Sequence, residues 1–207
     1  GSSFYAQGGI SAVLDAHDNF DSHVADTLAT AAGLAEKTAV KFMVESAPAA
    51  IASLERSGVR FTKDSDHYHL TTEGGHTHRR VAHVADKTGQ SIQINLLDNV
   101  KQCANITLFE NYIAIDLLIQ NKQCCGAYIL NKDTHQVESF IAHKTILATG
   151  GASKAYLYTS NPDTSTGDGI AMASRAGCDI MNMEFTQFHP TCLYHPHAKS
   201  FLISEAI

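Results

Sequence analysis

The segment Glu184–Thr191 gathers side chains that can bind or transform a small molecule. Within eight residues it holds a carboxylate, an amide, an imidazole and two hydroxyls around two aromatic rings. Pro190 fixes its own φ at about −65° and favours extended backbone at His189, so that imidazole does not lie on a helix. A fixed imidazole can donate to a carboxylate or move a proton near neutral pH. A strand that ends in a loop with a surface histidine is the competing interpretation, and these residues alone do not separate the two.

A second polar segment, Thr72–Arg80, combines a carboxylate with cationic groups. Arg79 and Arg80 suit a dicarboxylate ligand, although a pair of solvated surface arginines looks the same in a sequence. Glu73 would repel a plain dicarboxylate, but it would attract an ammonium group on the same molecule. The segment therefore favours a substrate that carries an amino group beside its carboxylates.

The histidines in and around this segment raise the alternative of a metal site. His76 and His78 lie on one face if the backbone is extended. Three more histidines are close in the sequence, namely His67, His69 and His83. No cysteine or carboxylate follows at a ligand spacing, and the neighbouring arginines would repel a cation, so we expect no metal. A non-catalytic His-rich binding module stays open as a function of a different class.

Two glycine pairs and the start of one predicted helix could bring backbone amides close to a ligand. Gly8 and Gly9 leave N–H donors uncovered, although a tight turn alone also explains the pair. An apolar run ends in Gly150 and Gly151, and in an α/β protein a ligand approaches the carboxyl end of such a strand. Asp168 begins a predicted helix, where a carboxylate stabilises the free N–H groups. The sequence holds no G-x-G-x-x-G phosphate loop.

Helices and strands are mixed along the chain, which predicts an α/β or α+β fold. Four helices are predicted, from Ser22 to about Ala32, from Thr38 to Gly58, at Thr88–Lys101 and from Asp168 to Ala176. Pro48 should kink the second helix or break it into two. Four runs rich in β-branched residues predict an antiparallel meander, at Ile106–Glu110, Tyr112–Ile119, Gln123–Leu130 and Val137–His143. Further strands are expected at Val59–Thr62 and Thr145–Gly151.

Composition argues against several classes of function. With 207 residues and 44% hydrophobic content, the chain can bury a substantial core. No apolar run approaches the roughly 18 residues of a membrane span, and no signal peptide is apparent. A net charge of −6, with no block among the 15 lysines and arginines, gives no footprint for nucleic acid. Five cysteines without a C-x-x-C pair favour a reducing cytoplasm over a disulfide framework.

Several motifs together are similar to one flavoprotein family. They are Ser2–Gly9, Thr72–Arg80, Ala148–Lys154, Asn161–Asp163, Ser165–Met172, Arg175–Cys178 and Leu193–Pro196. They resemble the family that includes succinate dehydrogenase, fumarate reductase and L-aspartate oxidase, and the Glu73-Gly-Gly-His motif is similar to its amino-acid oxidase branch. The resemblance implies a two-dinucleotide-binding FAD fold over residues 1–182, and an α+β capping domain that starts near Met183 and fills residues 183–207. We expect an internal fragment, without the family's phosphate loop and catalytic arginine.

The resemblance also implies where cofactor and substrate bind. FAD contacts are expected at Ser2, Ser3, Phe4, Tyr5, Ala6, Gln7, Gly8 and Gly9, at Ala148, Thr149 and Gly150, and at Asp168. A histidine that bonds covalently to the flavin in the dehydrogenase branch falls at Ser2, so here the FAD should be held without a covalent bond. His189 and Glu73 are the expected catalytic residues. Further substrate contacts are expected at Gln187, Thr191, Ser204, Glu205, Arg79 and Arg80.

The reaction implied by the resemblance is the FAD-dependent oxidation of L-aspartate to iminoaspartate, with oxygen or fumarate as acceptor, in de novo NAD biosynthesis. The expected partners are the small molecules L-aspartate and fumarate, with a functional link to quinolinate synthase and no nucleic acid or membrane. A soluble fumarate reductase or succinate dehydrogenase flavoprotein is the alternative enzyme, and Glu73 argues against it.

Overall fold

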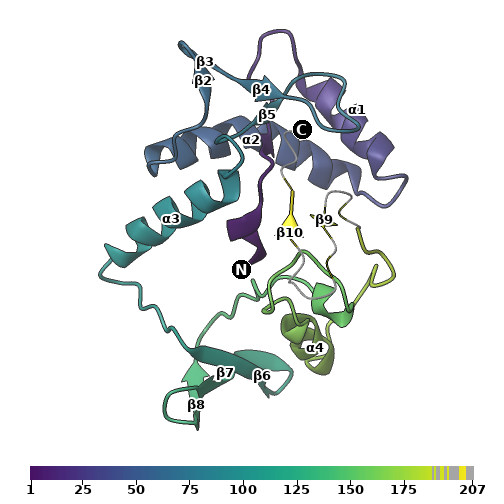
Figure 1. Ribbon diagram of the computed structural model, residues 1–207. Coiled ribbons are helices and arrows are strands. Elements are labelled where there is room, and N and C mark those ends of the chain that lie inside the picture. The colour runs from purple at the N-terminus through teal and green to yellow at the C-terminus, as the bar shows by residue number, and fades with distance from the viewer. Residues whose placement is uncertain (188, 190–191, 194, 196–200, 204–207) are drawn as a thin grey trace. The chain divides into compact units, whose positions relative to one another are not determined.

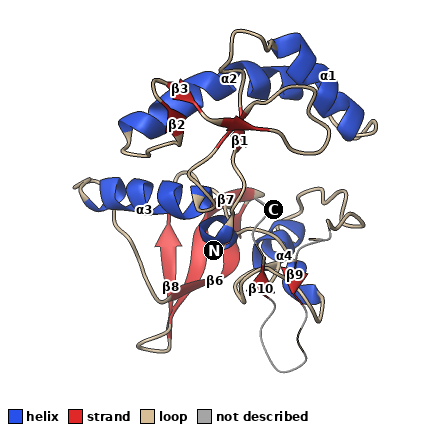
Figure 2. Cartoon of the chain, turned by 45° about the horizontal axis from the view of Figure 1, so that its top comes forward, coloured by secondary structure: helices blue, strands red, loops and turns tan. Residues whose placement is uncertain are grey.

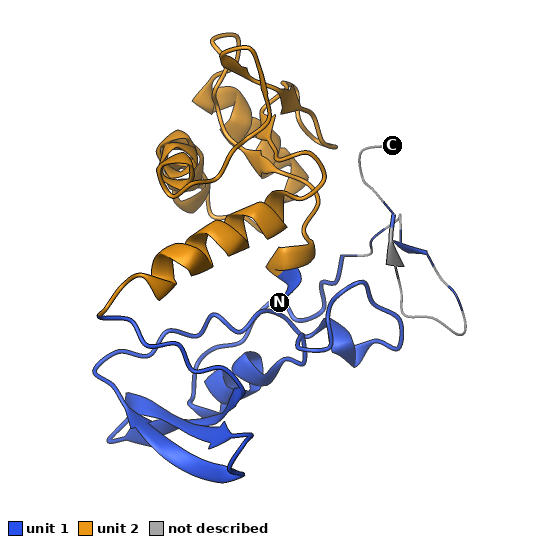
Figure 3. Cartoon of the chain, turned by 60° about the vertical axis from the view of Figure 1, so that its left-hand side comes forward, with its two compact units in different colours: residues 1–2, 105–203 blue, residues 3–104, 204–207 orange. Residues whose placement is uncertain are grey.

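The computed structural model describes residues 1–187, 189, 192–193, 195 and 201–203. These residues belong to two compact units, coloured separately in Figure 3. Unit 1 comprises residues 1–2 and 105–203, and the described part of unit 2 is residues 3–104. Each unit has its own secondary structure.

Unit 2 holds three α-helices, α1 (Phe20–Thr30), α2 (Lys37–Arg56) and α3 (Thr88–Lys101), labelled in Figure 1. The third agrees with the predicted range. The first begins earlier than predicted, because the amide oxygen of Asn19 accepts a hydrogen bond of 2.8 Å from the backbone N–H of Ser22. Glu36 caps α2 in the same way, through a 2.8 Å bond from the N–H of Ala39. Side-chain caps thus fix both helix starts.

Pro48 lies inside α2 but does not divide it into two helices. A proline removes one backbone donor and crowds the preceding turn, which favours a break. In α2, however, Val44 and Ile51 lie on either side of the proline and both are buried, at 1% and 0% exposure. Ala47, directly before the proline, and Ile51 after it pack in the same cluster of apolar side chains, which holds the two halves in one helix.

The strands of unit 2 are short and antiparallel. Strand β5 (Val81–Ala82) lies between β1 (Ile10–Ser11) and β4 (Leu70–Thr71), and β2 (Lys63–Asp64) pairs with β3 (His67–Tyr68). The strand predicted at Val59–Thr62 does not form. The side chains of Val59 and Phe61 are buried. The backbone of Thr62 bonds to two neighbouring residues, because its N–H donates to the carbonyl of His83 and its carbonyl accepts from the N–H of His69.

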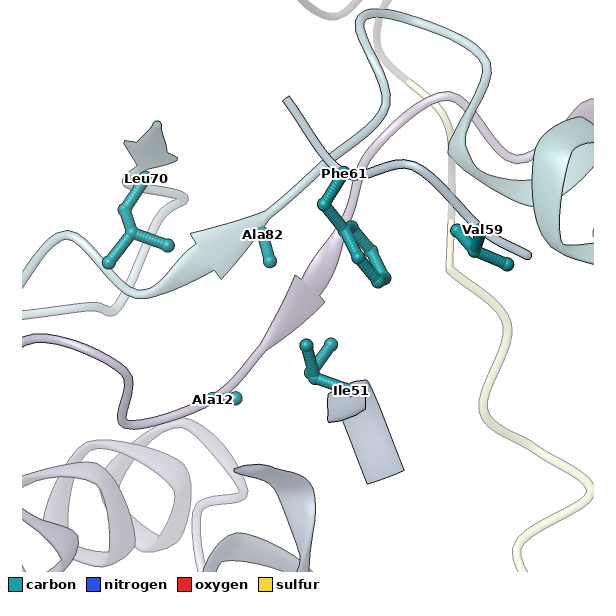
Figure 4. Close-up of a cluster of buried hydrophobic side chains, with 6 residues drawn as sticks. All are labelled: Ala12, Ile51, Val59, Phe61, Leu70 and Ala82. Atoms are coloured by element: carbon teal, nitrogen blue, oxygen red, sulfur yellow. The ribbon is translucent and has the colours of Figure 1, made fainter. Parts of the chain in front are cut away.

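The core of unit 2 lies between α2 and the three-stranded sheet. Figure 4 shows the side chains that form it, Ala12, Ile51, Val59, Phe61, Leu70 and Ala82. Ile10 of β1 and Ile92 of α3 are partly buried against this cluster. The core therefore fixes β1 and the first part of α3, and Ile10 and Ile92 also line a cavity of this unit.

Unit 1 contains the predicted antiparallel meander, drawn as strands in Figure 2. It consists of β6 (Tyr112–Gln120), β7 (Gln123–Asn131) and β8 (Gln136–Ile141), with β7 in the centre. Asn121 and Lys122, with φ of 52° and 61°, form the tight turn between β6 and β7. Helix α4 (Asp168–Arg175) is tied to β6 by a 2.8 Å bond from Arg175 to Asp116. Strands β9 (Cys192–Leu193) and β10 (Phe201–Leu202) pair with each other.

Two predicted strands of unit 1, Ile106–Glu110 and Thr145–Gly151, are not strands in the structure. A strand forms only where a neighbour supplies its hydrogen bonds, and no described strand pairs with either segment. Ile146 accordingly is 88% exposed, although its sequence is that of a buried strand. Across the described part of the chain, no helix has the length and apolar character needed to cross a membrane.

Candidate active site

A cavity of about 620 Å³ in unit 2 brings together two segments that are far apart in the sequence. It is lined by the small residues Ser3, Ala6, Gly8, Gly9 and Gly89, by Ile10, Ile92, Leu96 and Leu97, and by Glu73, Thr88 and Gln93. Four of the expected flavin contacts and Glu73 thus lie at one cavity. Its volume is in the range of about 300–1,000 Å³ that is usual for small-molecule sites.

Part of the lining of this cavity depends on a close contact between the N-terminal turn and helix α3. The turn is the 3₁₀ helix η1 (Ser2–Tyr5), and the N–H of Gly89 donates to the carbonyl of Ala6 at 3.0 Å. A Cβ atom at Gly89 would lie 1.9 Å from the carbonyl oxygen of Ser3, so only glycine fits. Sequence reasoning missed Gly89. The available signal was a glycine in the first turn of an otherwise regular helix.

The other expected flavin contacts of this segment have different surroundings. Phe4 and Tyr5 pack edge to face, with ring centroids 5.3 Å apart, and neither lines the cavity. Gln7 does not line it either, but its carbonyl accepts a 3.4 Å bond from the hydroxyl of Thr88. Gln7 therefore helps to hold the segment on α3.

Glu73 lies on the turn between β4 and β5 and is exposed. The N–H of His76 donates to the carbonyl of Glu73 at 3.1 Å and closes the turn. Gly75 has a φ of +89°, and a Cβ atom there would lie 2.7 Å from the hydroxyl oxygen of Thr30. The carboxylate is therefore carried by a turn with a defined backbone, as a recognition residue requires.

Arg80 has a different role from the predicted one. Its side chain is 0% exposed, and its Nε and Nη2 atoms donate to the two oxygens of Asp18 at 2.9 and 2.8 Å. Its Nη1 donates to Asp26 at 2.7 Å. A buried guanidinium with two carboxylate partners stabilises the fold and does not reach a substrate, which corrects the expectation of a substrate contact. The partners were not recognised in the sequence, because Asp18 and Asp26 precede Arg80 by more than fifty residues.

The hydrogen bonds of Arg80 also affect the pKa of Asp26. Burial acts to raise the pKa of Asp26, but hydrogen bonds from Thr77 and Arg80 outweigh it and leave that pKa below its ordinary value. Asp26 therefore remains ionised beside Arg80. This ion pair joins α1 to the segment that enters β5.

Arg79 lines a second cavity of unit 2, of about 490 Å³, rather than the one that Glu73 lines. Its Nε donates to the carbonyl of Leu70 at 2.7 Å.

Among the histidines, His69 and His83 share a hydrogen bond of 2.8 Å. Within the described residues, no three His, Cys, Asp or Glu side chains are close enough together to hold a metal ion.

In unit 1, Gln187 and His189 line a cavity of about 220 Å³ together with Tyr156, Tyr158 and Asn161. The hydroxyl of Tyr156 lies 3.2 Å from that of Thr186. The structure thus places Gln187, a predicted substrate contact, and His189, a predicted catalytic residue, at one pocket with tyrosine and asparagine side chains. Three other predicted contacts, Thr191, Ser204 and Glu205, lie outside the described residues.

The remaining expected flavin contacts also lie in unit 1. The hydroxyl of Ser2 donates to the amide oxygen of Asn161 at 2.7 Å. The segment Ala148–Gly150 is irregular and exposed except for its contact with the start of α4, where a Cβ at Gly169 would lie 1.7 Å from the hydroxyl oxygen of Thr149. Asp168 is exposed in the first turn of that helix. Thr149 therefore lies against Gly169, the residue that follows Asp168, and the shared flavin site of Thr149 and Asp168 stays a prediction.

Comparison with known proteins identifies the relatives of this chain. Residues 1–207 match the family described as FAD binding domain. Over its whole length the chain is 55% identical to L-aspartate oxidase 1 of Ralstonia nicotianae and 52% identical to L-aspartate oxidase of Pseudomonas aeruginosa, of which it covers 40% and 41%. It thus spans about two fifths of the length of these curated relatives.

Among solved structures, the chain is similar to the quinol fumarate reductase FrdA of E. coli. The TM-score is 0.90 at 32% identity, over 93% of this chain and 33% of that one. This similarity confirms the predicted flavoprotein fold, with its mixture of helices and antiparallel sheets.

Proposed function

Because the chain belongs to the FAD binding domain family, we propose that it is part of an enzyme that oxidises L-aspartate to iminoaspartate, with oxygen or fumarate as electron acceptor. One observation carries the proposal. Glu73, the residue suited to an ammonium group, lines the same cavity as Ser3, Ala6, Gly8 and Gly9. The identity to L-aspartate oxidases supports the choice of substrate.

The cavity fits the FAD that the family binds. Gly8, Gly9 and Gly89 carry no side chains that would fill it, and Ile92 and Leu96 offer an apolar wall to a flat ring system. Ala148–Gly150 and Asp168 are proposed to hold other parts of the cofactor. Ser2 has no nucleophilic nitrogen, so the flavin would be held without a covalent bond. Bound FAD would supply a two-electron acceptor for the hydride that leaves Cα of the substrate.

The side chains of the chain would bind and orient the substrate. Glu73 would accept hydrogen bonds from the α-ammonium group, a charge-assisted contact of the stronger kind. Gln187 and His189 would donate to a carboxylate, and the imidazole of His189 could hold or release a proton as the charge on the substrate changes. Thr191, Ser204 and Glu205 are proposed as further substrate contacts.

The wider setting is proposed on the same basis. Residues 1–182 would form the FAD-binding domain, and the capping domain would begin near Met183. An imine reacts with water, so its consumer should act promptly, and we propose a functional link to quinolinate synthase in NAD biosynthesis. A cytoplasmic location fits the free thiols of all five cysteines.

A fumarate reductase or succinate dehydrogenase flavoprotein is the second candidate. The similarity to the E. coli quinol fumarate reductase favours it. Against it, a plain dicarboxylate would meet the negative charge of Glu73 at the cavity. The two candidates therefore differ in whether the carboxylate of Glu73 attracts the substrate or repels it.

The test is an anaerobic titration of the full-length holoprotein, followed by the visible absorbance of the flavin. We expect L-aspartate to bleach the flavin, and succinate at the same concentration to bleach it far more slowly. Bleaching by succinate alone would favour the second candidate. A colourless protein, or one that neither compound bleaches, would overturn both.

A further inference from the structure

His76 makes one hydrogen bond through each of its ring nitrogens. Its Nδ1 accepts from the backbone N–H of Glu73 at 3.4 Å, and its own backbone N–H donates to the carbonyl of Glu73 at 3.1 Å. The side chain therefore closes a ring across the Glu73 turn. Its Nε2 lies 3.3 Å from the hydroxyl oxygen of Ser11 in β1. The neighbouring residue in β1, Ile10, lines the cavity that Glu73 also lines.

The partners of His76 assign its tautomer. A backbone N–H can only donate, so Nδ1 must carry the lone pair and the proton of the neutral ring must be on Nε2. The N–H at Nε2 then donates to the hydroxyl of Ser11. The neutral imidazole thus joins the Glu73 turn to β1 with both nitrogens used.

The ring of His76 also packs against a second histidine. His23 of α1 lies edge-on to it, with ring centroids 5.9 Å apart at an interplanar angle of 90°. His23 is 5% exposed, and its Nδ1 has no hydrogen-bond partner among the described residues. Burial, and next the positive charge of Arg80, lower the pKa of His23, so this ring stays neutral. A neutral buried neighbour limits the orientations open to the His76 ring.

We infer that His76 is the positioning residue for Glu73, and that its Nδ1 sets the turn that presents the carboxylate to an amino substrate. The inference rests on the proposed function. His76 does not line the cavity and would touch neither flavin nor substrate. It would act by holding the backbone of Glu73, so its loss should impair reactions that use the ammonium contact and spare those that do not.

Two substitutions in the full-length enzyme separate the bonds of His76. His76→Asn keeps an amide oxygen near the position of Nδ1 and loses the contact with Ser11. His76→Gln keeps an amide N–H near the position of Nε2 and loses the acceptor for Glu73. We expect His76→Gln to raise the KM for L-aspartate at least about tenfold, and His76→Asn to raise it less than about threefold, because one charge-assisted contact is at stake. Fumarate reduction should stay within about twofold in both, which also shows that the variants fold.

A double-mutant cycle tests whether His76 acts through Glu73. If it does, His76→Gln should have almost no further effect on aspartate oxidation when Glu73→Gln is already present. His69→Gln is the matched control, because His69 bonds to His83 and not to this turn, and it should leave both reactions unchanged. Additive losses in the cycle, or equal losses of aspartate oxidation and fumarate reduction in His76→Gln, would overturn the inference alone. A wild-type enzyme that does not oxidise L-aspartate would overturn the proposed function and the inference with it.

Discussion

At the scale of single residues, Arg80 belongs to a structural ion pair and not to the substrate contacts. Its removal would leave the carboxylate of Asp18, whose side chain is 2% exposed, without the guanidinium that it pairs with. We expect Arg80→Met to lower the free energy of unfolding by about 3–5 kcal/mol, the usual effect of breaking a buried pair from one side. Urea denaturation measures it. Arg79→Met is the control and should change the stability by less than about 1 kcal/mol, because Arg79 is exposed. Equal effects of the two variants would contradict a structural role specific to Arg80.

Tyr68 offers a second prediction at this scale, in its dependence on pH. Its hydroxyl donates to Glu55 at 2.7 Å, and burial followed by the nearby Glu55 raises the pKa of Tyr68 to about 12. A raised pKa favours the protonated phenol in the folded state. Its stabilising contribution is therefore complete below the unfolded pKa of about 10 and is lost as the pH rises towards the folded value.

The difference in unfolding free energy between wild type and Tyr68→Phe isolates this contribution from that of the other titrating groups. We expect the difference to be constant at neutral pH and to shrink between roughly pH 10 and 12. A difference that does not change over this range would show that the phenol of Tyr68 is not held by Glu55.

Residue types in the sequence identified part of the site. Glu73 and the Gly8–Gly9 pair were predicted separately, and the structure places them at one cavity. Arg80 could not be assigned correctly, because its burial and its two acidic partners arise only from tertiary packing. Gly89 was missed for a similar reason, since the need for glycine comes from the carbonyl of Ser3, distant in the sequence.

At the scale of elements, the contact between η1 and α3 shapes the cavity. Alanine normally stabilises a helix relative to glycine by about 0.5–1 kcal/mol. At Gly89 the added methyl would lie 1.9 Å from the carbonyl oxygen of Ser3. We therefore expect Gly89→Ala to displace η1 from α3 and to lower the flavin content of the purified full-length protein several-fold.

Ser91→Ala provides the control for Gly89→Ala, because it changes the same helix outside the cavity lining. Flavin released by denaturation and measured per mole of protein gives the readout. A normal flavin content in Gly89→Ala would mean that η1 does not contact the cofactor.

Elements with local signals were predicted well, and elements that depend on distant partners were not. Helix α3 and the strands β6, β7 and β8 carry their patterns within a few residues, and all four are confirmed. The apolar run at Thr145–Gly151 has the same local pattern but no paired neighbour among the described strands. Hydrogen-bond partners, rather than side-chain pattern, decide whether such a run becomes a strand.

At the scale of the whole molecule, large apolar side chains are exposed on the described chain. Ile146, Leu157 and Met181 are 88%, 85% and 77% exposed. The chain covers about two fifths of its curated relatives. We expect further segments of a longer protein to cover such residues, because burial of apolar side chains is favourable.

The 207-residue chain alone should therefore bind the dye ANS strongly, whereas the full-length holoprotein should bind it weakly. Isothermal titration should also show FAD affinity at least about a hundredfold lower for the chain alone, because parts of the cofactor would lack partners. Equal ANS fluorescence and equal FAD affinity in the two proteins would contradict this prediction.

Glu73 decides between an amino substrate and a plain dicarboxylate, and its substitution in the full-length enzyme is the most direct test. Glu73→Gln keeps the shape of the side chain and removes its charge. We predict that Glu73→Gln lowers kcat/KM for L-aspartate by an amount that corresponds to a loss of about 1–3 kcal/mol of transition-state stabilisation, the scale of one charge-assisted contact. The kcat/KM for fumarate reduction should stay within about twofold of the wild-type value. Steady-state kinetics with both substrates measures the two values. Equal losses for aspartate and fumarate would show that Glu73 supports the fold and does not recognise the ammonium group.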